Sequence, residues 1–157
     1  MYKIQVPGGH IQQKCVYPKG SSNSFLYSGG MFNVAGIRNG TKIVSTSVQG
    51  CKPDTMGLGP IGASQKALER ANLKIKDIDI VELNEAFASQ SLACIRDLNI
   101  DHDKVNIDGG ALALGHPLGA TGARITGKAA QLLKRENKKY ALATQCIGLG
   151  MGIATII

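Results

Sequence analysis

The sequence predicts an α/β fold in which a mixed, mostly parallel sheet is flanked by helices. Three observations lead to this fold class. From residue 41 onward, short β-rich runs alternate with segments of helical periodicity in the order β-α-β-α-β-α-β-β. A chain of 157 residues that is 43% hydrophobic can bury the core of one domain. Glycine-rich loops separate the later elements and allow sharp turns between them.

The first sixty residues predict one hairpin between two irregular stretches. Glycines and prolines interrupt every element that could form in residues 1–30. Residues 32–38 and 41–48 are β-rich and flank Asn39-Gly40. Asn-Gly between two such runs predicts a hairpin, because both turn positions need positive φ. Residues 50–60, rich in glycine and proline, predict a loop.

A helix, a strand and a second helix are predicted next. Pro60 suits the first turn of a helix that runs to about Asn72. Residues 79–83 predict a short strand. Asn84 can then cap the second helix, with Glu85 favourably placed in its first turn.

The remaining elements surround a glycine-rich segment at residues 109–122. A short strand at 105–107 precedes this segment, and a helix with regular apolar spacing follows it to about Glu136. Two closing strands are expected at 140–144 and 151–157. The continuous apolar run of the last strand predicts that it is buried on both faces.

The net charge of +7 comes mainly from the first part of the chain, because residues 1–60 carry six basic groups and one acidic group. A solvated basic surface, an anionic small-molecule ligand and nucleic acid are all compatible with this excess. These charges lie far apart in the sequence, and no nucleic-acid-binding motif accompanies them. We therefore expect no nucleic-acid partner.

The four cysteines, at positions 15, 51, 94 and 146, form no Cys-x-x-Cys pair. The three histidines add no zinc-ligand spacing, so neither a metal site nor a disulfide framework is expected. Each thiol is either a small buried apolar group or a reactive thiolate. No apolar run approaches the roughly 20 residues of a membrane span, and the N-terminus lacks a signal-peptide pattern. We expect a cytoplasmic protein without a membrane partner.

Three loops that follow predicted strands each contain one polar residue that needs an explanation. Asn84 follows the strand at 79–83, and its simplest role is a helix cap. His116 lies between glycines and before a proline, so it is either structural or catalytic. Cys146 precedes two spaced glycines, Gly148 and Gly150, and is either a core residue or a thiol beside backbone N–H donors.

Taken together, the segments 84–88, 109–124 and 146–150 closely resemble the three C-terminal signatures of thiolases, in the same order and at similar separations. Residues 55–60 resemble the loop that precedes them in that family. The resemblance covers residues 41–157, which we interpret as a thiolase C-terminal-like domain with a layered half-thiolase fold. Residues 1–40 match no N-terminal thiolase segment and form an unassigned, atypical leader.

The resemblance implies a role for four residues. Thiolases make or cleave β-ketoacyl-CoA by a Claisen condensation through an acyl-enzyme. By resemblance, His116 activates the acylated cysteine and later lines an oxyanion hole, where Asn84 holds a water. Cys146 removes the α-proton of acetyl-CoA or returns it, and a neighbouring imidazole could lower the pKa of this thiol. The N–H of Gly148 contributes to a second oxyanion hole. The same loops imply substrate-binding positions at Met56, Phe87 and Pro117.

The chain departs from the family pattern because no cysteine lies in the Cys-Gly-Ser-Gly-like setting of the acyl-accepting residue. The resemblance therefore implies an acetyl-CoA C-acetyltransferase-like half that uses CoA thioesters as substrates and has no covalently bound cofactor. It would need a homo-oligomer or a partner chain that supplies the N-terminal half. Two alternatives stay open: a weak acyl-CoA hydrolase that uses Cys146 and His116, and a non-catalytic remnant that binds CoA thioesters or a partner protein.

Overall fold

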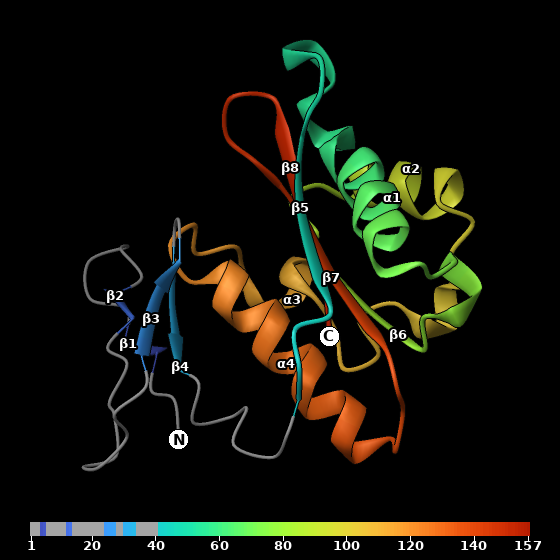
Figure 1. Ribbon diagram of the computed structural model, residues 1–157. Coiled ribbons are helices and arrows are strands. Elements are labelled where there is room, and N and C mark those ends of the chain that lie inside the picture. The colour runs from blue at the N-terminus through green and yellow to red at the C-terminus, as the bar shows by residue number, and fades with distance from the viewer. Residues whose placement is uncertain (1–3, 6–11, 14–23, 28–29, 34–40) are drawn as a thin grey trace.

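The computed structural model describes residues 4–5, 12–13, 24–27, 30–33 and 41–157 (Figure 1). Two short antiparallel pairs come first: β1 (Ile4–Gln5) with β2 (Gln12–Gln13), and β3 (Ser24–Tyr27) with β4 (Gly30–Asn33). The Asn39-Gly40 turn of the predicted hairpin lies outside the described residues. The described parts of its two arms pair elsewhere: β4 pairs with β3, and β5 (Ser45–Gly50) pairs with β8 (Met151–Ile156).

A four-stranded sheet in the order β5-β8-β7-β6 forms the centre of the domain (Figure 1). The predicted α/β class and mixed sheet are confirmed. The expectation of a mostly parallel sheet is wrong, because only β6 (Ile80–Leu83) and β7 (Ala141–Ile147) are parallel. The other two pairs are antiparallel, since a short turn reverses the chain between β7 and β8, and β5 then adds to the far side of β8.

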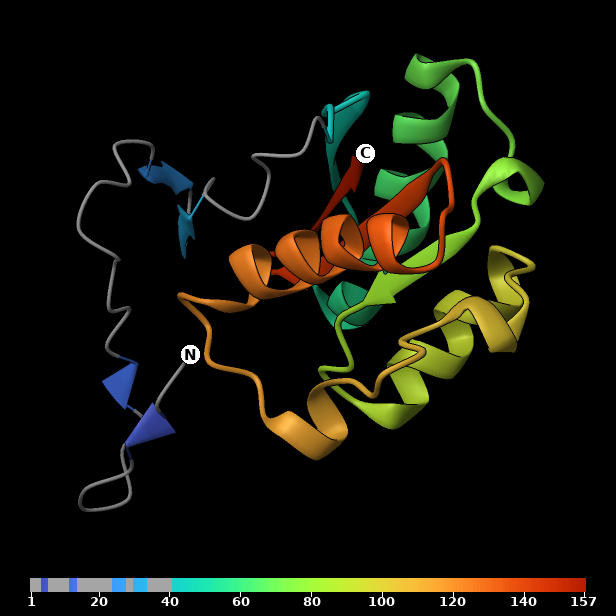
Figure 2. The same ribbon diagram turned by 90° about the horizontal axis from the view of Figure 1, so that it is seen from below.

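Helices cover both faces of this sheet (Figures 1 and 2). The residues of one core cluster come from α1 (Gly59–Ala71), α2 (Ala88–Asp97) and one face of the strands. A second cluster joins α4 (Thr121–Arg135) to the opposite face of β6 and β7. In β8 the buried residues alternate with half-buried ones, so the predicted burial of this strand on both faces is wrong. The helix α4 lies over β6 and β7, which leaves one face of β8 partly open.

The helix α1 begins where predicted, with Pro60 in its first turn, and its start packs directly on β8. A Cβ atom on Gly152 would overlap the backbone of Gly59, so the two backbones are in van der Waals contact. The hydroxyl of Ser47 donates to the carbonyl of Ala63 at 2.6 Å and fixes α1 against β5 as well. Before α1, the chain forms the 3-10 turn η2 (Pro53–Leu58).

The region after β6 differs from the prediction. The second helix begins at Ala88 rather than beside Asn84. Of the strand predicted at 105–107, only Val105 bridges to the sheet, in a parallel contact with Val81. Asn106 has φ 48° and therefore leaves strand geometry. Two further 3-10 turns, η3 (Ile75–Asp77) and η4 (His102–Lys104), flank these elements.

The side chain of Asn106 replaces the strand that ends at Val105. Its Oδ1 accepts the N–H of Leu83 at 3.0 Å, and its Nδ2 donates to the carbonyl of Leu83 at 2.8 Å. The same Nδ2 donates to Oε1 of Glu85 at 2.8 Å. One amide thus pairs with both backbone groups of Leu83, the last residue of β6. Leu83 is buried, so these groups would otherwise have no partner.

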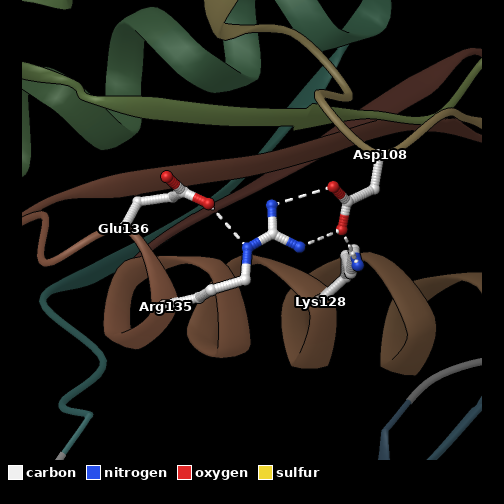
Figure 3. Close-up of polar contacts among 4 residues, drawn as sticks. All are labelled: Asp108, Lys128, Arg135 and Glu136. Atoms are coloured by element: carbon white, nitrogen blue, oxygen red, sulfur yellow. Dashed lines mark hydrogen bonds and ion pairs between the residues drawn. The ribbon is translucent and has the colours of Figure 1, made fainter.

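An ion network fixes α4 to the loop that follows Asn106 (Figure 3). The guanidinium of Arg135 binds both carboxylate oxygens of Asp108, at 2.6 and 2.8 Å, and Lys128 contacts the same carboxylate. These two cations hold the pKa of Asp108 well below its usual range. Glu136 extends the network through the Nε of Arg135, at 2.6 Å. The loop therefore has a defined position before the short helix α3 (Ala111–Leu114).

None of the helices in the described part of the chain is long and apolar enough to cross a membrane.

Candidate active site

Two of the predicted site residues lie at the carboxyl ends of neighbouring strands, which form one edge of the sheet. Asn84 directly follows β6, and its N–H donates to the carbonyl of Thr144 in β7 at 2.9 Å. Cys146 lies two residues further along β7. Because β6 and β7 are parallel neighbours, the loops that follow them leave the sheet on the same side. His116 reaches this edge from the connection between α3 and α4.

The structure brings Asn84 and His116 into contact. The amide Nδ2 of Asn84 lies 3.3 Å from Nε2 of His116, and Asn84 is completely buried. The other ring nitrogen, Nδ1, lies 2.7 Å from Oγ1 of Thr121. Burial lowers the pKa of His116, and the positive charge of Arg124 lowers it further. The ring is therefore a neutral imidazole near pH 7, held at both nitrogens.

The backbone around His116 explains how this position is reached. Gly115 ends α3 with φ 87°, a conformation that L side chains rarely adopt. The carbonyl of Pro117 accepts the N–H groups of Ala120 and Thr121, at 2.9 and 3.0 Å, and so begins the turn into α4. His116 is thus placed between a glycine that reverses the chain and a proline that restricts the backbone of His116. These constraints fix the position of His116, which the sequence left as either structural or catalytic.

Cys146 is buried and has no hydrogen bond to His116 among the described residues. It lies opposite Gly152 in β8, on the face of the sheet that packs against α1. Burial raises the pKa of this thiol, partly offset by a backbone hydrogen bond and reinforced by Cys51. The expectation that an imidazole lowers the pKa of Cys146 is therefore wrong for this structure, because burial raises that pKa and no imidazole in the described part of the chain is hydrogen-bonded to the sulfur.

The turn between β7 and β8 carries Gly148. A Cβ atom at this position would meet nothing within 4 Å, so its backbone is open to approach. The next residue, Leu149, has φ 67° and is 94% exposed. Gly150 then contacts the start of the η2 segment, where the N–H of Cys51 donates to its carbonyl at 2.7 Å. The β7–β8 turn is therefore packed against, and hydrogen-bonded to, the residues that lead into η2.

The three residues predicted to bind substrate lie on separate segments. Met56 is half-buried in η2, Phe87 is 62% exposed directly before α2, and Pro117 is half-buried beside His116. Large apolar side chains are exposed directly before α2, in and after α3, and in the β7–β8 turn: Phe87, Leu112, Leu114, Leu118 and Leu149. The loops around the candidate site thus present an apolar surface.

Sequence reasoning missed several polar residues near this site. Glu85 braces two loops rather than a helix start: its Oε2 accepts the N–H of Leu112 at 2.9 Å, and its carboxylate occupies the space that a Cβ on Gly110 would need. Glu82 is completely buried within β6, and its burial raises its pKa to about 7 despite the nearby charge of Arg124. A single carboxylate within a four-residue apolar strand was the available signal.

Within the described residues, no group of three or more His, Cys, Asp or Glu side chains is arranged to hold a metal ion.

Comparison with known proteins identifies relatives for most of the chain. The family model described as "Thiolase, C-terminal domain" matches residues 37–157. The 3-ketoacyl-CoA thiolase of Vibrio parahaemolyticus is 50% identical over 140 residues, which cover 87% of this chain and 36% of that protein. Residues 41–157 make up about three quarters of the chain, so this match also includes some residues before 41.

Solved structures give the same result for the fold. The human mitochondrial 3-ketoacyl-CoA thiolase is 53% identical, with a TM-score of 0.72, and the match covers 73% of this chain and 29% of that one. The Bacillus anthracis acetyl-CoA acetyltransferase is 45% identical, with a TM-score of 0.71 and the same coverage. A structure of the human enzyme in complex with CoA also matches. The chain spans about a third of the length of these relatives.

Proposed function

The chain belongs to the thiolase family, and from this membership we propose that it is one half of a thiolase-type acyltransferase that acts on CoA thioesters. The reaction would be cleavage of a β-ketoacyl-CoA by CoA, or the reverse Claisen condensation, of the acetyl-CoA C-acetyltransferase type. In this proposal His116, Asn84, Cys146 and the N–H of Gly148 form the catalytic part contributed by this chain. The acyl-accepting cysteine comes from a second half.

The contact between Asn84 and His116 is the observation that carries the proposal. Two residues 32 positions apart meet at 3.3 Å, and both belong to signatures that resemble the family. A water held by the Asn84 amide and a protonated imidazole N–H are both donors, and together they can stabilise the oxyanion of a thioester enolate. Each donor of this kind contributes about 3 kcal/mol to catalysis in enzymes where one has been removed.

The raised pKa of Cys146 supports a proton-donating role in the cleavage direction. The thiolate of the second half attacks the β-keto carbon, and His116 accepts the proton of that thiol. The bond between the α- and β-carbons then breaks, and its electron pair stays with the α-carbon as the enolate of acetyl-CoA. The protonated thiol of Cys146 donates its proton to this carbon. CoA finally attacks the acyl group as the thiolate of Cys146 takes its thiol proton, and His116 returns its proton to the partner cysteine, which leaves as the free thiol.

The second half is proposed from two observations. The chain spans about a third of its relatives, so those proteins contain further segments beside a domain like this one. The exposed apolar side chains on the site loops form a surface that a second polypeptide, or a second copy, can cover. Met56, Phe87 and Pro117 then bind the CoA thioester at this junction. We propose residues 41–157 as the domain, and residues 1–40, part of which the relative also matches, stay without an assigned role.

The test is complementation. The N-terminal two thirds of the Vibrio parahaemolyticus relative is expressed separately and mixed with the full chain, and thiolysis of acetoacetyl-CoA by CoA is followed. We expect no turnover with the chain alone and measurable turnover with the mixture. Cys146→Ala and His116→Ala should each reduce this turnover by at least about 100-fold. Cys51→Ser, which changes a half-buried thiol before η2, is the matched control and should stay active.

Other outcomes would contradict the proposal. A mixture that associates and binds acetyl-CoA by calorimetry, but does not turn over, identifies a non-catalytic binding module. Release of CoA from acetyl-CoA by the chain alone, lost in Cys146→Ala, identifies a Cys/His hydrolase.

A further inference from the structure

We propose that Thr121 is a positioning residue that holds the imidazole of His116 in the tautomer with its proton on Nδ1. Thr121 is the first residue of α4, and it is completely buried. Its hydroxyl is the hydrogen-bond partner of Nδ1, at 2.7 Å. The importance of this tautomer rests on the function proposed above, but the assignment itself does not.

The hydrogen-bond capacity of the hydroxyl decides the tautomer. A threonine hydroxyl has one proton to donate and two lone pairs to accept with. Oγ1 of Thr121 donates its proton to the carbonyl of Pro117, at 3.0 Å. The oxygen can then only accept a hydrogen bond from the ring, so Nδ1 of His116 must carry the proton.

The opposite side of the ring gives the same answer independently. Nε2 of His116 faces the amide Nδ2 of Asn84 at 3.3 Å, and an amide nitrogen only donates. Nε2 must therefore present its lone pair. A hydroxyl on one side and an amide on the other thus select one of the two neutral tautomers of His116.

The helix start fixes the position of this hydroxyl. The N–H of Thr121 also donates to the carbonyl of Pro117, at 3.0 Å, so backbone and side chain bind the same oxygen. The β-branched side chain has few rotamers available in a helix. Oγ1 is therefore held at Nδ1 by the fold and needs no rearrangement when the ring changes protonation state.

This arrangement suits a base that works at Nε2. The lone pair of Nε2, which faces the Asn84 amide in this structure, accepts the proton of the partner thiol when that contact is exchanged for the thiol. The hydrogen bond from Nδ1–H to Thr121 is present both before and after that transfer. Removal of the hydroxyl takes away the acceptor of Nδ1–H. Only the Asn84 amide then favours Nδ1–H, so part of the proton population is expected to move to Nε2, where the lone pair is needed.

The experiment reads the tautomer directly by long-range 1H–15N correlation of histidine-labelled full chain, in which the two ring nitrogens of each tautomer have distinct shifts. His116→Gln identifies the His116 signals, and exposed His102 is the internal control. We expect the Nδ1–H form in the unsubstituted chain, a shift towards the Nε2–H form in Thr121→Val and Thr121→Ala, and restoration in Thr121→Ser. A pH titration should give a lower pKa for His116 in the valine variant than in the serine variant, because the imidazolium loses an acceptor for Nδ1–H.

The Nε2–H tautomer in the unsubstituted chain would overturn the proposal without any variant. An unchanged tautomer in folded Thr121→Val and Thr121→Ala, with folding checked by circular dichroism, would overturn it as well. The readout needs no turnover. Expected tautomers together with inactive complementation would therefore refute the proposed function alone.

Discussion

Replacement of Asn106 by glycine should destabilise the domain strongly, although a residue with φ 48° is usually a favourable place for glycine. Glycine keeps the backbone conformation and removes only the amide. The side chain of Asn106 makes three hydrogen bonds, two to the backbone of Leu83 and one to Glu85. The change therefore isolates the contribution of a side chain that takes the place of a neighbouring strand.

The magnitude follows from the groups left behind. The N–H and the carbonyl of Leu83 lie within a residue that is 1% exposed, so neither gains full access to water. A buried polar group without a partner costs about 1–3 kcal/mol, and the bond to the Glu85 carboxylate adds about 1 kcal/mol. We expect a loss of roughly 3–5 kcal/mol, which is a large part of the stability of a domain of this size.

The assay is urea unfolding followed by far-ultraviolet circular dichroism, with Asn99→Gly as the matched control. Asn99 has φ 52° but is exposed, so its replacement should change the free energy of unfolding by no more than about 0.5 kcal/mol. Asn106→Ala should be less stable than Asn106→Gly by about 1 kcal/mol, because alanine also strains this backbone. A loss below about 1 kcal/mol in Asn106→Gly would refute the reasoning.

Three further predictions concern stability and its pH dependence. Gly152→Ala should lower the free energy of unfolding by at least about 3 kcal/mol in urea titrations, since its Cβ meets the backbone of Gly59, whereas Gly127→Ala, with open space around it, should be neutral or stabilising. The folded-state pKa of Glu82, about 7, lies above the usual value of 4.5, so this group stabilises the fold below pH 4.5 and loses that contribution as the pH rises from 4.5 through 7. Glu82→Gln cannot ionise, and its stability relative to the unsubstituted chain should rise by roughly 2–3 kcal/mol between pH 5 and pH 8; an equal difference at both pH values would contradict this. Leu149→Gly should raise the melting temperature, with a gain of about 1 kcal/mol, because it relieves a left-handed backbone and gives up almost no burial.

Local patterns predicted the elements that local interactions determine. Apolar spacing and Pro60 identified α1 and α4, and the short turn after Cys146 identified the β7–β8 connection. The parallel or antiparallel orientation of the strands was not predictable in this way, because it depends on which strand β5 pairs with. The structure places β5 beside β8, at the far end of the chain.

The candidate site shows the same division. The three loops and their polar residues were visible in the sequence, but their contacts were not. Asn84 has a good capping side chain, yet its amide contacts His116 and the helix begins four residues later. The hydrogen bond between Thr121 and the ring of His116 was not predicted, since nothing in a glycine-rich segment indicates which hydroxyl reaches a histidine five residues away. Hydrogen bonds between distant loops appear only once the fold is known.

The position of β8 has a consequence for how the domain forms. Although β8 is the last element of the chain, it lies inside the sheet, between β5 and β7, and it also packs against α1. During synthesis, β5 and α1 therefore leave the ribosome long before β8, the strand that packs against both. Ser45 can pair with Ile156 only after Ile156 has been synthesised. Such distant pairing slows folding and prolongs the exposure of apolar surface. Loss of β8 would remove two strand pairings at once, so a nascent chain that stops before Met151 should be a substrate for chaperones and proteases.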